Sequence, residues 1–282
     1  MSTEKTIYFV AGLPRSSSTL LMNILGQNPR FYVTPTSGIL DMLSQVRNNW
    51  DKNDANQAHD RQENEQLKRN VLRSMLYGYF AHVDQPVCFD KSRFWLEYLE
   101  MAEALLGSRD KVKVLVPVRD LRDVVASFER LFRKTSALGQ VPLEADNVIK
   151  CKTALGRFEL FADDAQPVGR AFNAIRDAIT RGWQRNLHFI NYADLTSKPQ
   201  QTLAESYRFL GEPPFQHDFQ HVEQITIEDD FAYGFKDLHV IRHTVEPQPP
   251  QWPQTFDDTV YGSNAWKNVE RFAHFWNSSQ KA

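Results

Sequence analysis

Three short β-rich runs, each followed by a helical pattern, constrain the fold of this chain more than any other feature. The runs cover residues 7–11, 112–118 and 187–192, and the helical patterns that follow them cover residues 18–25, 121–132 and 200–210. A strand followed by a helix, repeated along a chain, is typical of a parallel sheet whose strands are joined by crossover helices. A further run at residues 86–89 predicts one more strand. We therefore expect an α/β fold of three layers, with a central parallel β-sheet flanked by helices.

The 282 residues are expected to form a single domain, because one hydrophobic core can still grow at this length. Residues 247–253 contain four prolines, which exclude a regular helix or a central strand. This segment separates the body from a last helix at residues 263–276, whose apolar stripe is expected to pack against the body. Residues 45–70 are polar and are interpreted as a solvated loop or helix, a surface insertion that leads into a buried helix.

The charge balance argues against bulk binding to nucleic acid. The chain has 33 Lys and Arg residues against 35 Asp and Glu, a net charge of −2, which still permits a local basic pocket for a small anion. Cys88 and Cys151 are too few for a disulfide framework or a sulfur-held metal, and they are interpreted as buried thiols in a reducing compartment. The N-terminal apolar run is too short for a signal peptide, and no window is long enough for a membrane span. A cytoplasmic location is expected.

The most informative segment is the turn at residues 12–19, G-L-P-R-S-S-S-T, because it joins an apolar strand to a helix. At such a junction backbone N–H groups can cradle an anion. In the nucleotide-triphosphatase pattern G-x-x-x-x-G-K-[ST], Gly12 and Thr19 match, whereas Ser17 replaces the second glycine and Ser18 replaces the lysine. The turn therefore predicts anion binding with a chemistry different from that of a nucleotide triphosphatase.

Other groups of the turn can replace the missing lysine. Arg15 supplies positive charge from the loop, and hydroxyl and N–H donors come from Ser16, Ser17, Ser18 and Thr19. The alternative is an ordinary strand-turn-helix junction in which a serine caps the helix. Ser17 adds a Cβ where a glycine would let the backbone approach phosphate, so it is expected to shift the loop or weaken binding.

A second anion site is predicted after the run at residues 112–118, which delivers Arg119 at its end. Ser127 follows eight residues later, about two helical turns at ~3.6 residues each. A helix that packs alongside the strand end would present both side chains to one phosphate. The alternative is an ordinary amphipathic helix. It would be the favoured interpretation of this segment alone, and it becomes less so because the turn at residues 12–19 also predicts anion binding.

Together these segments resemble a known family. Residues 12–20 are similar to the 5′-phosphosulfate loop of sulfotransferases, in the P-R-S-G-T-T-L form of tyrosylprotein sulfotransferases and their bacterial relatives. Residues 119–127 resemble the 3′-phosphate motif of the family, residues 191–195 resemble its tyrosine-acidic-aspartate-leucine segment, and residues 89–93 its strand-end lysine segment. The four segments occur in the order of the family, which is far more specific than any single match.

The resemblance implies a P-loop-like fold and the donor 3′-phosphoadenosine-5′-phosphosulfate (PAPS), with the bisphosphate PAP as product and no metal. It implies that Arg15 and the turn at residues 16–19 hold the 5′-phosphosulfate, and that Arg119 and Ser127 hold the 3′-phosphate. Tyr192 would pack against the nucleotide. The sulfuryl group would pass to a hydroxyl or amine of a small-molecule, glycan or peptide acceptor that the sequence does not identify. The oligomeric state is likewise left open.

The same resemblance implies that Lys91 stabilises the bridging oxygen as the sulfuryl group leaves, assisted by Arg15. The general base departs from the family. Arg93 stands where cytosolic sulfotransferases place a histidine, and residues 34–38 lack the glutamate of tyrosylprotein sulfotransferases. Asp41 is the nearest acid and the candidate base, with His82 a weaker candidate.

Two other functions stay open from the sequence. A divergent P-loop kinase of a small molecule would need the turn to accept ATP and Mg²⁺, and the serine at position 18 speaks against it. A non-catalytic protein that binds adenosine bisphosphate is favoured by the missing base, whereas Lys91 argues against it. Arg242 follows no motif and is interpreted as a surface arginine that could reach the nucleotide or an acidic acceptor.

Overall fold

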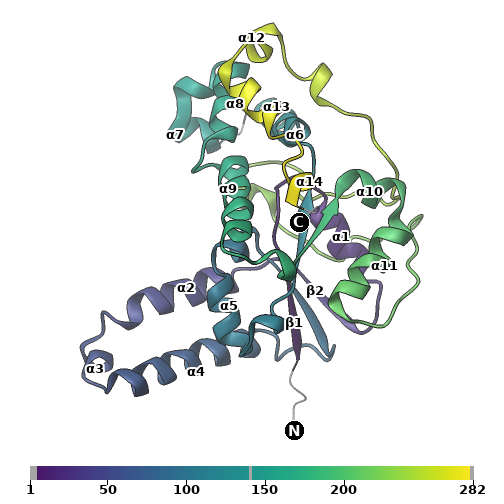
Figure 1. Cartoon of the computed structure of the whole chain (residues 1–282). Helices are drawn as coiled ribbons and strands as arrows, with labels where there is room; N and C mark the ends of the chain where they lie inside the picture. The colour runs from purple at the N-terminus through teal and green to yellow at the C-terminus, as the bar shows by residue number, and fades with distance from the viewer. Residues whose placement is uncertain (1–4, 140–141, 280–282) are drawn as a thin grey trace.

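The centre of the molecule is a five-stranded parallel sheet with the strand order β2-β3-β1-β4-β5 (Figure 1). The computed structural model describes residues 5–139 and 142–279. The strands are β1 (Thr6–Val10), β2 (Phe31–Thr36), β3 (Val87–Lys91), β4 (Val114–Val118) and β5 (Leu187–Asn191). From β1 the chain crosses to the β2 edge and returns through β3, and it then continues on the other side of β1 with β4 and β5.

Helices join the strands and cover both faces of the sheet. Their bounds are α1 (Ser18–Leu25), α2 (Ile39–Trp50), α3 (Asp54–Gln57), α4 (Arg61–Tyr79), α5 (Leu99–Leu106), α6 (Leu121–Ser136), α7 (Pro142–Cys151), α8 (Ala154–Ala162), α9 (Pro167–Thr180), α10 (Tyr192–Ser197), α11 (Pro199–Leu210), α12 (Asp258–Tyr261), α13 (Asn264–Arg271) and α14 (Trp276–Ser279). None of these helices within the described residues is long and apolar enough to cross a bilayer.

The side chains of β1 point alternately into two cores, which shows how the layers form. Ile7 and Phe9 face one core, which also contains apolar residues of α2, α5, α6, α8 and α9. Tyr8 and Val10 face a second core that contains residues of α1 and α11. Successive side chains of a strand point to opposite faces, so a strand that is apolar throughout needs a helical layer on each side. The predicted α/β fold of three layers is therefore confirmed.

Four of the five strands lie where the sequence predicts them, within a few residues. The exception is β2, which the sequence analysis did not predict. Pro35 lies near its end, and the pairing register with β3 shifts between Val33 and Thr36. Proline cannot donate to a β-ladder, so it is tolerated on an edge strand or at a bulge. With this proline between two threonines, β2 lacks the apolar β-rich signature of the other four runs.

The polar stretch at residues 45–70 belongs to an arm of α2, α3 and α4 that extends away from the sheet, as Figure 1 shows. At the other end of the chain, the predicted helix at residues 263–276 is two helices, because α13 ends at Arg271 and α14 starts at Trp276. The stripe still packs as expected, with Trp266 and Trp276 buried in the core. Both cysteines are buried. That the chain forms one domain stays a prediction.

The turn after β1 lies directly against β4. The β1 ladder continues past its last residue, since Ala11 N–H donates to Leu115 O and Leu13 N–H donates to Pro117 O. A Cβ built on Gly12 would lie 2.3 Å from the carbonyl oxygen of Pro117, closer than real Cβ atoms approach backbone. Only glycine therefore allows the turn to continue along β4.

We expect Gly12→Ala to destabilise the protein, because the methyl group would force the β1 and β4 backbones apart. The loss is about 1–3 kcal/mol, the usual range for overpacking. Urea unfolding followed by circular dichroism measures it. The control is Gly78→Ala in α4, where a Cβ would meet nothing within 4 Å and helix propensity favours alanine by up to about 1 kcal/mol. Equal effects of the two substitutions would contradict the steric explanation.

Candidate active site

A cavity of about 410 Å³ opens at the carboxyl end of the sheet, where ligands bind in open α/β folds. Its walls come from the turn after β1 and from the ends of β3 and β4. They also include the start of α10 and the segment at residues 233–251. Of the residues that the sequence predicted, the cavity is lined by Arg15, Ser17, Ser18, Thr19, Lys91, Arg119, Ser127 and Tyr192. The fold thus brings the two predicted anion sites to one cavity.

The turn at residues 12–19 presents backbone donors to the cavity. Arg15 and Ser17 both have positive φ, 58° and 69°, and such alternation turns successive N–H groups toward one point. The N–H groups of residues 17–20 have no acceptor among the described residues, as expected for the first turn of a helix. Ser17 adopts the left-handed conformation although it is not glycine, so the replacement keeps the backbone shape and adds strain to it.

Ser16 has a different orientation from its neighbours. It is 1% exposed, and its hydroxyl donates to the carbonyl oxygens of Leu13 and Pro117. The side chain therefore fixes the turn on β4 and is not among the groups that line the cavity.

Arg15 links three parts of the site. Its Nε donates to the hydroxyl of Ser127 on α6 at 3.0 Å, and its Nη1 donates to the carbonyl of Leu238. Burial, followed by the charges of Arg119 and Arg130, lowers the pKa of Arg15 to about 10. The side chain is still a cation at neutral pH, held beside other cations with no carboxylate in contact. Such a cluster is poised for an anion.

Arg119 is buried at the end of β4 and is only partly satisfied. It pairs with Asp123 at 3.4 Å, and its guanidinium lies 4.3 Å from the ring centroid of Tyr192. Its Nε is buried and has no hydrogen-bond partner among the residues that the structure describes. A buried charged donor without an acceptor is unfavourable by a few kcal/mol, so this atom fits an anionic ligand.

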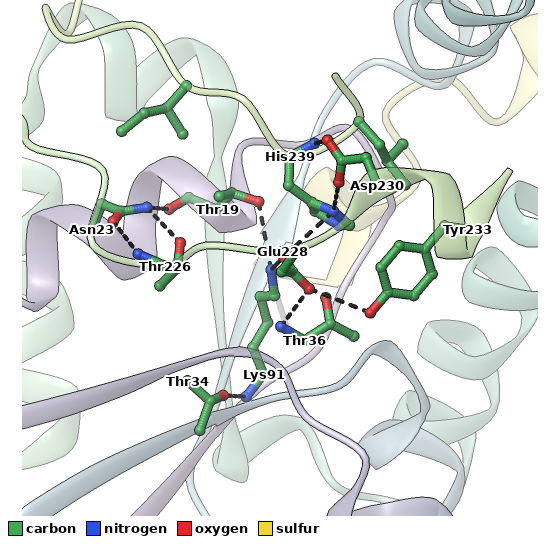
Figure 2. Close-up of polar contacts among 12 residues, drawn as sticks. Thr19, Asn23, Thr34, Thr36, Lys91, Thr226, Glu228, Asp230, Tyr233 and His239 are labelled. Carbon is green, nitrogen blue, oxygen red and sulfur yellow. Dashed lines mark hydrogen bonds and ion pairs between the residues drawn. The ribbon is translucent and has the colours of Figure 1, made fainter. Parts of the chain in front are cut away.

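Lys91 and the polar groups around it form a cluster on the other side of the turn (Figure 2). Lys91, at the end of β3, donates to Glu228 Oε2 at 3.2 Å and lies 3.5 Å from Thr19 Oγ1. Both side chains of the ion pair are nearly buried, with 6% and 5% exposed. Burial lowers the pKa of Lys91, and the charge of Glu228 opposes this shift. Glu228 also accepts from the N–H of Thr36 at 2.7 Å, which joins β2 to the cluster.

Next to this cluster, His239 and Asp230 form a dyad. Nδ1 of His239 lies 2.6 Å from Asp230 Oδ1, and the backbone N–H of His239 donates to Asp230 Oδ2. A proton on Nδ1 that is held by the carboxylate leaves Nε2 as an acceptor. Burial and the charge of Lys91 lower the pKa of His239, so the imidazole is neutral at neutral pH. His239 lines the cavity.

The two bases suggested by the sequence lie elsewhere. Asp41 is exposed in the first turn of α2 and is not among the residues that line the cavity. His82 is exposed beyond α4, where its Nδ1 lies 2.9 Å from Tyr79 O and its ring meets Tyr32 edge-on. Arg242 does line the cavity and is exposed, with a 3.6 Å ion pair to Glu246.

Sequence reasoning missed Arg130 and His239, which line the cavity, and their neighbours Glu228 and Asp230, which contact Lys91 and His239. Arg130 lies on α6 near Arg119, and burial and that neighbour lower its pKa. The other three lie in a stretch without long helices or strands, so no periodicity or strand end marks them. The only available signal was the sequence I-E-D-D at residues 227–230, followed by an isolated histidine. Among the described residues, no group of three or more His, Cys, Asp or Glu side chains is arranged to hold a metal.

Comparison with known proteins decides the family. A model of the sulfotransferase family matches residues 8–217, well over half of the chain. The chain belongs to the sulfotransferase family. No curated protein sequence matches it.

Solved structures of sulfotransferases share the fold over almost the whole chain. The sulfotransferase domain of the Synechococcus PCC 7002 olefin synthase is 16% identical with a TM-score of 0.58, and the match covers 98% of this chain and 97% of that one. The sulfotransferase domain of the curacin biosynthetic pathway is 16% identical with a TM-score of 0.55, covering 95% and 97%. The mouse sulfotransferase SULT7A1, solved with PAP, is 14% identical with a TM-score of 0.54, covering 97% and 90%. These likenesses show the P-loop-like fold.

The strain at Ser17 leads to a prediction for this sulfotransferase. Ser17→Gly removes the cost of a left-handed Cβ, about 1–2 kcal/mol. Part of this gain is lost to the greater freedom of glycine in the unfolded chain, about 0.4–1 kcal/mol. The variant is therefore expected to be more stable by about 0.5–1 kcal/mol, a rise of roughly 1–3 °C in melting temperature. Calorimetry without nucleotide measures this change.

The matched control is Ser18→Gly, one residue later, at the start of α1. There glycine relieves nothing and is expected to lower stability by about 0.5 kcal/mol. Destabilisation by both substitutions would contradict the strain at Ser17.

Proposed function

We propose that this chain is a PAPS-dependent sulfotransferase that transfers the sulfuryl group to an acceptor hydroxyl or amine. The observation that carries the proposal is the presence of two anion sites in one cavity. One is the turn with free N–H groups at residues 17–20, and the other is Arg119 with its unpartnered Nε. A nucleotide with phosphate groups at two separate positions matches this pair. The PAP bound to the mouse relative supports the same ligand class.

In this proposal the turn and Arg15 hold the 5′-phosphosulfate, and Arg119 and Ser127 hold the 3′-phosphate. Tyr192 lies under the guanidinium of Arg119 and packs against the nucleotide. The 3′-phosphate is the feature that ATP lacks, so Arg119 selects the donor. Residues 17 and 18 are serines, so the turn has no lysine to pair with the β- and γ-phosphates, and this disfavours the kinase alternative.

When bound, PAPS supplies the sulfuryl group that is transferred. Lys91 would donate to the bridging oxygen of the donor and would stabilise the negative charge that develops there as the bond between this oxygen and sulfur breaks. Its position between Thr19 and Glu228 keeps the ammonium at the edge of the turn. Arg15 stabilises the same charge on the departing phosphate.

The base of this mechanism is His239. Its Nε2 accepts the proton of the acceptor hydroxyl as the acceptor oxygen attacks sulfur, and Asp230 stabilises the resulting imidazolium. Glu228 is the less suitable base, because it is already engaged by Lys91 and the N–H of Thr36. A dyad of this kind also argues against a protein that only binds the nucleotide.

The donor site is tested by calorimetric binding of PAP and of AMP, which lacks the 3′-phosphate. Arg119→Ala is expected to weaken PAP binding by about 10–100-fold, the loss of charged hydrogen bonds worth about 1.5–3 kcal/mol. AMP binding should change far less, since the group that Arg119 contacts is missing.

Arg208→Ala on the exposed face of α11 removes the same charge outside the cavity and is expected to leave PAP binding unchanged. Stronger binding of ATP with Mg²⁺ than of PAP to the wild-type protein would favour the kinase. Equal losses for PAP and AMP in Arg119→Ala would refute the 3′-phosphate assignment.

The base is tested by the pH dependence of kcat/KM with PAPS and a phenolic acceptor. His239 must be neutral to accept a proton, and its pKa is lowered below the usual value of about 6.5. Activity is therefore expected to be full near pH 7 and to fall as the pH drops through this lowered pKa. His239→Gln is expected to lower kcat by about 10²–10⁴-fold and to remove this acid limb.

Glu228→Gln serves as the comparison, because it lies against the same lysine. PAP affinity of both variants reports whether the donor site is intact. If the acid limb disappears in Glu228→Gln and persists in His239→Gln, the roles of the two residues are reversed.

A further inference from the structure

One cation in the cavity has neither an ion pair nor a hydrogen bond among the described residues. Arg93 begins the short 3₁₀-helix at Arg93–Glu97, directly after β3, and it lines the cavity. Among the described residues, no carboxylate lies within ion-pair distance of its guanidinium and no acceptor hydrogen-bonds to it. The centroid of the Phe94 ring lies 5.6 Å from the guanidinium carbon of Arg93. The side chain is nevertheless half-buried.

The neighbouring cations are neutralised. Arg170 makes two 2.8 Å hydrogen bonds to the carboxylate of Glu97, and Lys91 pairs with Glu228. Burial lowers the pKa of Arg93, and the charge of Arg170 adds to this effect. Among the described residues no carboxylate pairs with Arg93 itself, so its guanidinium is available to an anionic group of a ligand.

The sheet places Arg93 away from the nucleotide phosphates. Along the carboxyl edge the strand ends follow the order β3, β1, β4, β5. The turn follows β1, Arg119 follows β4 and Tyr192 follows β5, so a nucleotide extends from β1 toward β5. Arg93 follows β3, on the opposite side of the turn. Its neighbours there are Lys91 and Tyr233, in the part of the cavity left for the acceptor.

We propose that Arg93 binds a carboxylate of the acceptor, so that the substrate of this sulfotransferase is a hydroxylated carboxylic acid. This inference rests on the proposed function, because it takes the space beside Lys91 as the acceptor site. A guanidinium binds a carboxylate through two parallel hydrogen bonds. One guanidinium carries one positive charge and so fits a monoanion better than a phosphate dianion. Bound in this way, the acid directs its hydroxyl toward the lysine and histidine at residues 91 and 239.

The remaining wall favours an apolar body for this acid. Tyr233 and Val240 line the cavity and are 39% and 60% exposed. Nearby in the chain, Phe231 and Ile227 are 49% and 81% exposed. Exposed apolar side chains that line a cavity, as Tyr233 and Val240 do, are typical of a surface that contacts a ligand. The expected acceptor thus joins a carboxylate and a hydroxyl to a hydrocarbon or aromatic frame.

The experiment compares ligands that differ only in this charge. The probes are para-hydroxyphenylacetate with para-hydroxyphenylacetamide, and omega-hydroxyhexanoate with its amide, titrated into PAP-saturated protein. For at least one pair the acid is expected to bind about tenfold or more tightly than the amide. Arg93→Gln should bring acid and amide to within about twofold, whereas Arg93→Lys, which keeps the charge, should retain part of the preference.

Arg130→Gln is the matched control, because it removes a cavity cation on the nucleotide side. It is expected to weaken PAP binding and to leave the ratio of acid to amide unchanged at saturating PAP. Equal binding of acid and amide, no binding of either pair, or a preference that survives Arg93→Gln would overturn the proposal. So would a loss of PAP affinity in Arg93→Gln, which would assign the side chain to the nucleotide.

The two proposals can fail separately. The same probes are titrated into nucleotide-free protein, where a preference for the acid that Arg93→Gln abolishes would support the anion site even without PAP binding. Absent PAP binding would count against the donor assignment alone. Tight PAP binding without any preference for the acid would count against Arg93 alone.

Discussion

The site depends on how closely the turn after β1 approaches β4. The ladder continues through Leu13, and Gly12 leaves no side chain between the two backbones. The hydroxyl of Ser16 then donates to the carbonyl oxygens of Leu13 and Pro117. With the turn fixed there, Arg15 reaches Ser127 on α6, and the free N–H groups of α1 face the same space as Arg119. A small displacement of the turn would separate the two anion sites.

Much of this arrangement could be predicted from the sequence. Strands buried on both faces are apolar throughout, and a strand end followed by arginine or serine marks a position at the carboxyl edge. The end of the apolar run at residues 112–118 marked Arg119 and helical spacing marked Ser127, whereas Lys91 and Tyr192 were predicted from the resemblance to sulfotransferases. The edge strand β2 gave no such signal, because Pro35 lies between two threonines near its end. The segment with Glu228 and His239 has no periodicity at all, since long-range hydrogen bonds hold it in place.

The ion pair of Lys91 and Glu228 shows why the groups around Lys91 could not be found by spacing. The two residues are 137 positions apart, and each is nearly buried only because the other is present. Removing either would leave a buried charge without a partner. The sequence expectation placed a carboxylate near the first helix, at Asp41, whereas the fold brings its acidic groups from the other end of the chain. An ion pair between residues so far apart leaves no pattern in the local sequence.

The hydrogen bond from Arg15 to the carbonyl of Leu238 joins the donor side of the cavity to the residue that precedes His239. Substituting Arg15 therefore removes a charge and also releases the backbone that positions the imidazole. Two residues that share a backbone support have non-additive effects. In a double-mutant cycle, the loss on changing both Arg15 and His239 will be smaller than the sum of the separate losses. Kinetic constants of an Arg15 variant alone thus measure a coupled pair of residues and not the contribution of one guanidinium.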